Sequence, residues 1–408
     1  MPWKGSLMSQ RLEFVHAASR EDANIRQLCA TYGISPDTAY RWLRRCRVGG
    51  PEALAERSRK PHRSPTRTKP ELEQCVLKLR DEHPAWGGRK LRARLMAIGR
   101  THVPAASTVT AILQRHGRIS PEESAKHKPW TRFEAPAPND LWQMDFKGWF
   151  LLQNRQRCHP LSVLDDHSRY GLGLFACSNQ ETPTVREKLT TIFQRVGLPA
   201  AFLMDNGSCW GGHPGAPYTA LTVWLLQLGV AVRHGRPRHP QTQGKDERFH
   251  RTIKAEVLRA PLPAHAAAAQ QAFDRWLPIY NHQRPHEALG LAVPASRYRP
   301  SARPFPRTLQ PLEYPAGMLV RKVQANGLFH FNKRLFFLGT AFRGQPIALQ
   351  PTHTDGTWDI LFGTFTLARI TQADFQNRRV AVVRPLRYNR LSAGETEAGS
   401  AGEQPAEG

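Results

Sequence analysis

The segment between residues 141 and 178 decides the fold class, because it holds three stretches of one kind. They are "LWQMDFKGWFLL" (141–152), "PLSVLDDHS" (160–168) and "YGLGLFACS" (170–178). Each is a short apolar run bounded by turn residues, and this pattern predicts three successive β-strands.

Helices and strands alternate after this segment. The first is a helix at "TPTVREKLTTIFQRVG" (182–197), with Thr182 as its cap and Pro183 following it. The sequence then predicts a short buried strand at "AAFLMDNG" (200–207) and a helix at "YTALTVWLLQLG" (218–229). An extended segment at "VAVRHGR" (230–236) follows, and "HPQTQGKDERFHRTIK" (239–254) is a loop that leads into a further helix. Three strands followed by this alternation indicate a mixed sheet covered by helices, an α/β fold.

The stretch "IRQLCATYGISPDTAYRWLRRC" (25–46) predicts two helices joined by a tight turn at Gly33, with Ser35 as the N-cap of the second helix. The apolar side chains of this second helix share one face, so its polar side chains point outward. The outward residues that we assign to DNA are Thr38, Arg41 and Arg45. A helix-turn-helix presents its recognition helix to a DNA groove in this way, and an ordinary helical hairpin is the alternative.

A basic segment, "RSRKPHRSPTRTK" (57–69), follows this unit. Its cations are spaced by proline and serine, so it predicts a linker that tracks DNA phosphates, with a merely solvated linker as the alternative. The linker residues that we assign to DNA are Arg57, Arg59, Lys60 and Arg63. Beyond it, "HPAWGGRKLRARLMAIG" (83–99) and "ASTVTAILQRHGRI" (106–119) repeat the helical pattern, with Ser107 as a cap, and predict a second helix-turn-helix or winged-helix-like module.

The C-terminal part becomes rich in strands again at "GLFHFNKRLFFLG" (327–339) and "DGTWDILFG" (355–363), which predict a small β-barrel or sandwich. The chain is therefore expected to contain several domains. The predicted divisions are a helix-turn-helix domain 1–56, a basic linker 57–70, a second helix-turn-helix domain 71–122, a linker 123–139, the α/β core 140–300, a β-rich domain 301–390 and a disordered acidic tail 391–408.

The charge balance points to a polyanionic partner. The formal net charge is +25, from 58 Lys and Arg against 33 Asp and Glu. The six cysteines form no CxxC pair or zinc-type cluster, which predicts reduced thiols in the cytosol. With no signal peptide and no apolar run of about 18 residues, the sequence favours nucleic acid over a membrane as that partner.

Three acids stand at the ends of predicted elements. Asp145 lies in the first strand of the core, Asp205 ends the buried strand at 200–207, and Glu247 lies in the first turn of the helix after 239. An aspartate at the end of a strand in a helix-covered sheet points into the crevice where ligands bind. For any one of these acids taken alone, an ordinary cap or turn residue is the favoured interpretation.

Three carboxylates in one place require a cation. Two carboxylates about 4 Å apart repel by roughly 4 kcal/mol at an effective dielectric constant near 20. Carboxylate oxygens suit Mg²⁺ or Mn²⁺, and a pair of such ions can stabilise both the attacking and the leaving oxygen in a displacement at phosphorus. The three acids therefore predict a site for two divalent cations.

Several motifs resemble the catalytic core of DDE transposases and integrases of the retroviral type. They are "WQMDF", "LDDHSRY", "MDNGS", "HPQTQGKDERFHRTIKAE" and "YNHQRPHEALG". The resemblance is strongest to bacterial insertion-sequence transposases, whose helix-turn-helix region precedes the core. It implies an RNase H-like fold with Asp145, Asp205 and Glu247 as the catalytic, metal-binding triad. The distance from the second Asp to the Glu exceeds the family's usual spacing, and the excess lies in "WGGHPGAPY" (210–218).

The neighbouring acids are separated from the triad by geometry and by the resemblance. Asp165 and Asp166 resemble acids of the family's second strand that support the structure. Asp246 adjoins Glu247, and consecutive helical residues point about 100° apart, so the two cannot face one metal pair. The cations of this helix that we assign to DNA are Lys245, Arg251 and Lys254. For Arg251, an ion pair with Glu247 is the alternative.

The resemblance implies an enzyme that frees 3′ ends at the termini of a mobile element and joins them to target DNA. The resemblance also implies double-stranded DNA as the partner and a homo-oligomer that forms on this DNA. It further implies a location in the bacterial cytoplasm, at the nucleoid. The residues expected to support the site are Asp166, Asn206, Gln243, Asn281 and Arg284. A DNA-binding regulator with a silent core, and a nuclease that cuts without joining, are the alternatives.

Overall fold

The computed structural model describes residues 7–55, 68–119, 134–205, 207, 209–211, 217–234, 244–258, 261–376 and 380–383. The chain forms two compact units, Met1–Thr68 and Lys69–Gly408. Among the described residues, no helix combines the length and the apolar character needed to cross a membrane.

The first unit is a small helical bundle. Its elements are α1 (Leu7–Ala18), α2 (Ile25–Tyr32), α3 (Pro36–Gly49) and the short 3-10 helix η1 (Pro51–Leu54). Gly33 ends α2 at a left-handed φ of 62°, and the Ser35 hydroxyl accepts a hydrogen bond from the Thr38 N–H as the N-cap of α3. The predicted turn and cap are therefore confirmed, and Phe14 and Ala39 lie fully buried in the core.

The second unit begins with three helices, α4 (Pro70–Glu82), α5 (Gly88–Ala97) and α6 (Ala106–Arg115). They enclose a core that includes Trp86, Leu91 and Leu113. The prediction of Ser107 as a cap is wrong, because α6 begins at Ala106 and follows Ala105, which makes no side-chain cap. We call residues 69–119 the helical module.

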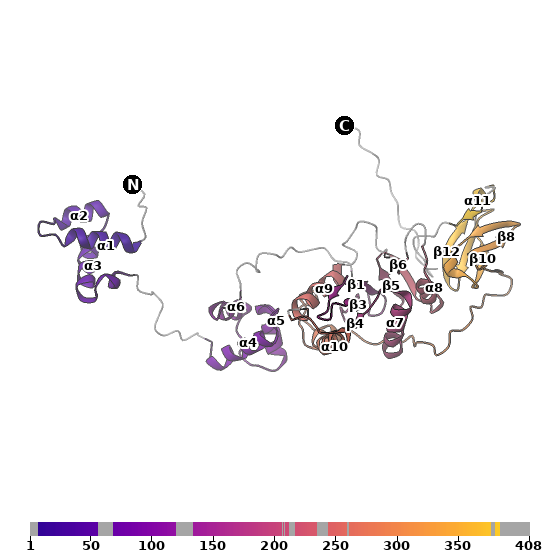
Figure 1. Cartoon of the computed structure of the whole chain (residues 1–408), viewed down its shortest axis with the longest axis horizontal. Coiled ribbons are helices and arrows are strands. Elements are labelled where there is room, and N and C mark those ends of the chain that lie inside the picture. Colours follow the sequence, from indigo (N-terminus) through magenta and orange to yellow (C-terminus); the bar gives the residue numbers. More distant parts are fainter. Residues whose placement is uncertain are drawn as a thin grey trace, which may run out of the picture. The chain divides into compact units, whose positions relative to one another are not determined.

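A mixed sheet forms the centre of the second unit (Figure 1). Its strands are β1 (Trp142–Phe146), β2 (Phe150–Leu151), β3 (Arg157–Asp165), β4 (Gly171–Cys177), β5 (Ala201–Met204) and β6 (Ala231–His234). Strand β1 pairs antiparallel with β3 and parallel with β5, which in turn pairs parallel with β6. The three predicted strands thus become four, because β2 is a separate short strand at the edge.

Helices cover both faces of this sheet, as predicted. One face carries α7 (Thr182–Val196) and α8 (Ala220–Gln227), and the other carries α9 (Gly244–Glu256) and α10 (Ala266–His282) (Figure 1). Thr182 is the first residue of α7 rather than its cap, and the capping position falls on Glu181. The expected α/β core is therefore present, with α9 on the same side of the sheet as α10.

The C-terminal strands form two sheets. One pairs β12 (Phe365–Ile370), β11 (Trp358–Phe362), β10 (Pro346–Pro351) and β7 (Leu319–Lys322), and the other pairs β13 (Ala381–Val382), β9 (Arg334–Phe337) and β8 (Leu328–Phe331). Among the described residues these pairings do not close into one ring, so a barrel stays a prediction.

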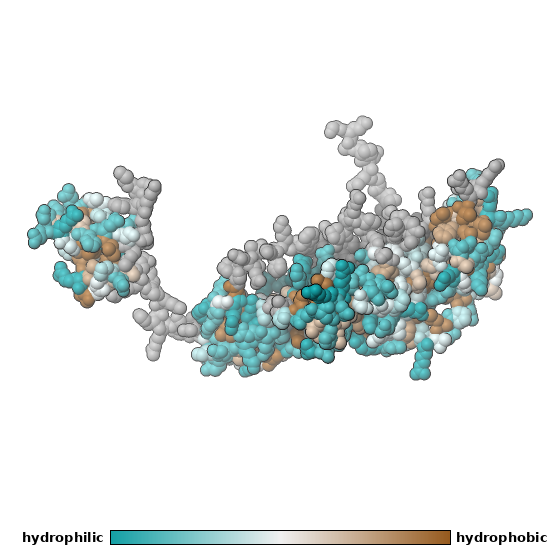
Figure 2. Space-filling view, viewed as in Figure 1, coloured by the Kyte–Doolittle hydropathy of each residue, from teal (hydrophilic) through white to brown (hydrophobic). Residues whose placement is uncertain are grey.

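The C-terminal strands pack against the core. The rings of Tyr218 and Phe342 meet edge to face at 5.0 Å, and the Tyr218 hydroxyl donates to the Leu367 carbonyl at 3.2 Å. Figure 2 shows hydrophilic residues over much of the visible face and a hydrophobic area over these strands. Val382, with 67% of its surface exposed, is one of the large apolar side chains that the region leaves accessible.

Candidate active site

The pairing of β1 with β5 brings the first two acids together. Trp142 lies opposite Phe202 and Gln143 opposite Leu203, so the same parallel register leads to Asp145 beside Asp205 at the ends of the two strands. Side chains alternate along a strand, and Trp142 and Met144 enter the core beneath α7 and α8. Asp145 therefore points to the opposite face, where α9 lies.

Helix α9 supplies the third acid. Its apolar side chains Phe249 and Ile253 are buried in the core with α10, and this packing orients the helix over β1. Burial, followed by the charges of Asp205 and Glu247, raises the pKa of Asp145 to about 7. The three predicted acids therefore lie close enough to act on one another electrostatically.

The loop after β5 orients Asp205. One oxygen of its carboxylate accepts a hydrogen bond from the Gly207 N–H at 2.8 Å. A Cβ at residue 207 would come within 2.9 Å of that carboxylate, so glycine keeps the approach open. The backbone carbonyl of Asp205 also contacts Nδ1 of His234 at 2.9 Å, which ties the end of β5 to β6.

His250, which the sequence interpretation did not assign to the site, lies against Asp145. Its Nε2 is 2.7 Å from the Ser162 hydroxyl, and its Nδ1 is 3.8 Å from a carboxylate oxygen of Asp145. Burial, assisted by the charge of Lys147, lowers the pKa of His250 to about 4. The spacing could have found this residue, because His250 follows Glu247 by three positions and so shares its side of α9.

Asp246 lies fully buried under the site. Among the described residues neither of its carboxylate oxygens has a hydrogen-bond partner. Burial, followed by the charge of Asp145, raises its pKa well above the ordinary range. The two consecutive acids thus lie in opposite environments, since Glu247 is exposed.

Asp165 and Asp166 are held by hydrogen bonds inside the fold. Asp165 accepts from the backbone of Asn139 at 2.7 Å and of Ser168 at 2.8 Å. Asp166 accepts from Gln143 at 2.6 Å and from the Ala135 N–H at 2.7 Å. Both carboxylates are therefore engaged in supporting the strand ends.

Lys245 does not occupy the position expected of a DNA contact. Its ammonium pairs with Asp166 at 2.5 Å and also donates to the Asp166 backbone carbonyl at 3.1 Å, with 12% of the side chain exposed. The geometry assigns Lys245 to the same supporting network as Asp166, because a buried cation held by a carboxylate is not presented to a phosphate.

Arg251 and Lys254 are exposed on α9, as predicted. Among the residues that the structure describes, no ion pair joins Arg251 to Glu247, so the glutamate is not held by this arginine. Lys147, which is half-buried, lies near Lys254: burial, followed by the charge of Lys254, lowers the pKa of Lys147. A basic edge formed by Lys147, Arg251 and Lys254 therefore accompanies the acids.

The "YNHQRPHEALG" motif braces the core. Asn281 accepts from the Gly171 N–H at 2.8 Å and donates to the Gly171 carbonyl at 2.9 Å, which fixes α10 to the start of β4. Arg284 donates to Glu256 at the end of α9, at 2.9 Å. Asn206 and Gln243, the other residues expected to support the site, lie outside the described residues.

The candidate DNA contacts of α3 have different environments. Arg41 is exposed, and its guanidinium is 3.4 Å from the Thr38 hydroxyl. Arg45 instead donates to the Ala55 carbonyl at 2.7 Å and so closes the end of the bundle. The linker candidates Arg57, Arg59, Lys60 and Arg63 lie outside the described residues.

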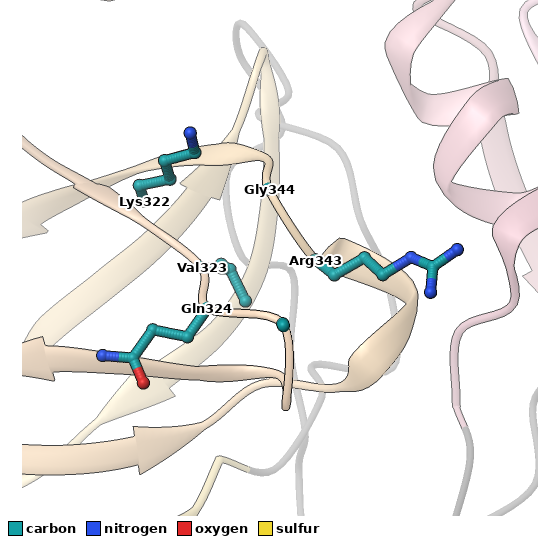
Figure 3. A pocket seen from close by; sticks show the side chains of 6 residues that line it. Lys322, Val323, Gln324, Arg343 and Gly344 are labelled. Atoms are coloured by element: carbon teal, nitrogen blue, oxygen red, sulfur yellow. The ribbon is translucent and has the colours of Figure 1, made fainter.

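A hollow of about 380 Å³ lies in the C-terminal region. Lys322, Val323, Gln324, Ala325, Arg343 and Gly344 line it (Figure 3). The side chains of Lys322 and Arg343 point in different directions, so they do not converge on one anion (Figure 3). The acids at the end of β1 and β5 therefore remain the best candidate for chemistry.

The three acids have the chemistry of divalent-cation ligands. Among the described residues, however, no group of three or more His, Cys, Asp and Glu side chains is arranged so that it could hold a metal ion. Burial, followed by the charges of Asp205 and Glu247, nevertheless raises the pKa of Asp145, and a bound cation would relieve the part that is repulsion between the acids. Three carboxylates suit Mg²⁺ or Mn²⁺ better than they suit a soft metal.

Family models match several segments of the chain between residues 10 and 381. Two models described as integrase core domain match residues 135–240 and 228–294. A helix-turn-helix domain matches 10–62, and a homeodomain-like domain matches 38–113. The C-terminal domain of IS481 family transposases matches 318–381.

Curated relatives match parts of the chain. The putative transposase InsD for insertion element IS2E of Escherichia coli is 31% identical over 108 residues, which are 26% of this chain and 45% of that protein. The Gag-Pol polyprotein of Walleye dermal sarcoma virus is 26% identical over 164 residues, 39% of this chain and 9% of the polyprotein. The chain thus spans less than half the length of either relative.

Solved structures match more loosely. A chain of the simian T-cell lymphotropic virus intasome in complex with PP2A regulatory subunit B56 gamma is 16% identical, with a TM-score of 0.34, over 71% of this chain and 96% of that one. The HTLV-2 integrase catalytic core domain in complex with magnesium is 13% identical, with a TM-score of 0.31, over 40% of this chain and 99% of that one. TM-scores this low carry no conclusion about chemistry.

Proposed function

We propose that this chain, which has the domains of an insertion-sequence transposase with an integrase-type core, binds the ends of an insertion sequence and acts on them as a polynucleotidyl transferase. It hydrolyses DNA at the 3′ ends of the element and joins those ends to target DNA. One observation carries the proposal: the parallel register of β1 and β5 sets Asp145 beside Asp205, and α9, which bears Glu247, packs against β1.

Asp145, Asp205 and Glu247 are the residues that would hold divalent cations, Mg²⁺ or Mn²⁺. Such ions, when bound, activate the attacking oxygen and stabilise the leaving oxygen at phosphorus. The chain itself positions the acids: the parallel β1–β5 pairing sets Asp145 beside Asp205, and the packing of Phe249 and Ile253 sets α9 over them. No protein nucleophile is required, because water and then a DNA hydroxyl attack.

The remaining residues of the site bind and orient DNA. Arg251, Lys254 and Lys147 provide cations next to the acids, where the phosphates flanking the reacting bond would lie. The recognition face of α3 and the basic linker bind the element ends. Binding as a homo-oligomer would bring two ends together on the target.

The test uses the full chain with DNA carrying its element ends, in the presence of Mg²⁺. Asp145→Asn, Asp205→Asn and Glu247→Gln are each expected to reduce 3′-hydroxyl release and joining by at least about 100-fold, since each removes a group that stabilises the transition state. Binding of the ends should stay within severalfold of wild type.

The matched control is Glu187→Gln on α7, whose side chain is 70% exposed on the far face of the sheet. This variant should keep wild-type activity. Joining by any of the three site variants would contradict the assignment. End binding by the wild-type chain without cleavage would favour a DNA-binding regulator, and cleavage without joined products would favour a nuclease.

A further inference from the structure

Glu256, the last residue of α9, is clasped by two donors from a different part of the chain. One carboxylate oxygen accepts from Nε1 of Trp276 at 2.9 Å, and the other accepts from Nε of Arg284, also at 2.9 Å. Only 8% of the Glu256 side chain and 7% of the Arg284 side chain are exposed. Both oxygens of a buried carboxylate are therefore used to hold the end of this helix.

The ion pair between Glu256 and Arg284 is buried, so each charge depends on the other for compensation. The Arg284 guanidinium also lies over the Tyr280 ring, with its central carbon 5.9 Å from the ring centroid. Removing one partner of a buried ion pair leaves the other charge buried without compensation, which strongly destabilises the fold. Glu256 and Arg284 thus have a strong preference for the one arrangement in which they meet.

The part of the chain that forms the clasp is itself fixed. Asn281 holds α10 to Gly171 through two hydrogen bonds. The helical module packs on the same end of α10, because Ile279 joins the module's apolar core and Arg94 donates to Gln283 at 3.1 Å. Trp276 and Arg284 therefore offer α9 a rigid anchor.

The anchor sets the rotation of α9 about its axis. Glu256 follows Glu247 by nine residues, which is about 900° at 100° per residue, so the two side chains leave the helix on opposite sides. Apolar packing by Phe249 and Ile253 is not directional, whereas two hydrogen bonds of fixed geometry are. Fixing Glu256 consequently fixes the direction in which Glu247 points.

We infer that Glu256 is a positioning residue for the reaction: through Trp276 and Arg284 it holds α9 so that Glu247 faces Asp145 and Asp205. The inference rests on the proposed function for what Glu247 does. It also gives the "YNHQRPHEALG" motif a role, which is to hold the catalytic helix through Arg284. A small rotation of α9 about its axis matters here, because it would move the carboxylate oxygens of Glu247 away from the other two acids.

The experiment compares Glu256→Gln and Trp276→Phe in the full chain, with Glu287→Gln as the control. Glu287 is exposed and lies three residues after Arg284, so this control removes the same charge in the same neighbourhood. Single-turnover 3′-hydroxyl release is measured against Mg²⁺ concentration, together with end binding. Hydrogen exchange is followed in residues 244–256 and in β3 and β4.

Glu256→Gln is expected to slow release about tenfold and to raise the Mg²⁺ concentration for half-maximal rate severalfold, with end binding within twofold of wild type. Exchange in α9 should accelerate about tenfold while β3 and β4 stay protected. Trp276→Phe should shift the same quantities in the same direction by less. Glu287→Gln should change none of them.

Two outcomes overturn the inference. One is an unchanged Mg²⁺ dependence in Glu256→Gln. The other is a Glu256→Gln variant in which hydrogen exchange accelerates throughout the core and the rate of 3′-hydroxyl release returns to the wild-type value on cooling. That result would show that Glu256 stabilises the fold as a whole and does not position α9. If the wild-type chain neither cleaves nor joins DNA, the proposed function fails, and Mn²⁺ binding without DNA decides the inference separately: weaker binding by Glu256→Gln with loosened α9 supports it, and equal binding overturns it.

Discussion

Asp145 shows how one side chain can couple metal binding to pH. Its pKa of about 7 has burial as the largest cause, followed by repulsion from Asp205 and Glu247. A carboxyl must lose its proton before it binds a cation, so metal binding by the site should depend on pH. Below pH about 7 we expect the affinity for Mn²⁺ to fall about tenfold per pH unit, and above it to level off.

The measurement is Mn²⁺ binding to the DNA-free chain at about pH 6 and pH 8, followed by electron paramagnetic resonance of the free ion. Glu187→Gln, which alters an exposed acid, should reproduce the wild-type profile. An affinity that does not change between the two pH values would mean that Asp145 is already ionised at the lower one.

Asp246 should make the folded chain less stable than it could be. A buried carboxyl without hydrogen-bond partners costs about 1 to 3 kcal/mol, and Asp246→Ala removes that cost. The pKa of Asp246 is higher in the folded chain than in the unfolded chain. The carboxyl therefore destabilises the fold increasingly as pH rises above its unfolded pKa of about 4. The gain from Asp246→Ala should therefore be larger at pH 7 than at pH 5.

Thermal unfolding of both proteins at the two pH values checks this prediction. Each kcal/mol should raise the midpoint by about 2 to 4 °C. Asp246→Asn keeps a polar group in the same place and is expected to gain less than the alanine variant. A lower midpoint for Asp246→Ala at both pH values would show that the carboxyl has a stabilising partner after all.

The separation of Asp246 from Glu247 illustrates what residue patterns can and cannot predict. Helical geometry predicts that two consecutive acids point about 100° apart, and the structure agrees that they lie in different environments. It does not predict that Asp246 is fully buried or that the charges of Asp145 and Asp166 act on it, because both depend on parts of the chain that are distant in sequence. The same limit concealed the pairing of Lys245 with Asp166.

At the scale of single elements, helix α3 offers a comparison of two adjacent arginines. Arg44 is exposed, whereas Arg45 donates to the Ala55 carbonyl and has a buried Nε. We expect Arg44→Ala to weaken binding of the element ends without changing stability. Arg45→Ala should lower the melting temperature of the first unit, because it removes the bond that closes the bundle.

Fluorescence anisotropy with end DNA and thermal unfolding measure the two effects separately. If Arg44 contacts a phosphate, its loss should reduce the slope of log affinity against log salt by about 1. If Arg45→Ala weakens DNA binding more than Arg44→Ala does, Arg45 belongs to the face that contacts DNA, as the sequence predicts.

Elements with strong local signals could be predicted, and elements defined by their partners could not. The turn at Gly33 and the Ser35 cap depend on neighbouring residues alone, and both are found as predicted. Strand β2 has only two residues, and its pairing with β3 across Phe150 and Cys158 leaves little local pattern. The predicted caps Thr182 and Ser107 are displaced by one and two residues, to Glu181 and Ala105, because capping depends on backbone geometry.

At the scale of the whole molecule, the charge of +25 makes a prediction about DNA binding that no single residue makes. Each phosphate that the chain neutralises contributes about −0.9 to the slope of log affinity against log salt. A chain that uses its recognition helix, basic linker and α9 together would make at least about six such contacts. We expect affinity for end DNA to fall about 10³-fold or more between 50 and 200 mM salt.

The slope is measured with end DNA and with an unrelated duplex of equal length. Charge alone should give both duplexes the same salt dependence, whereas sequence reading by α3 should give them different affinities. A slope shallower than about −3 would contradict the linker and α9 as joint phosphate contacts. Such a result would confine DNA binding to the N-terminal helices.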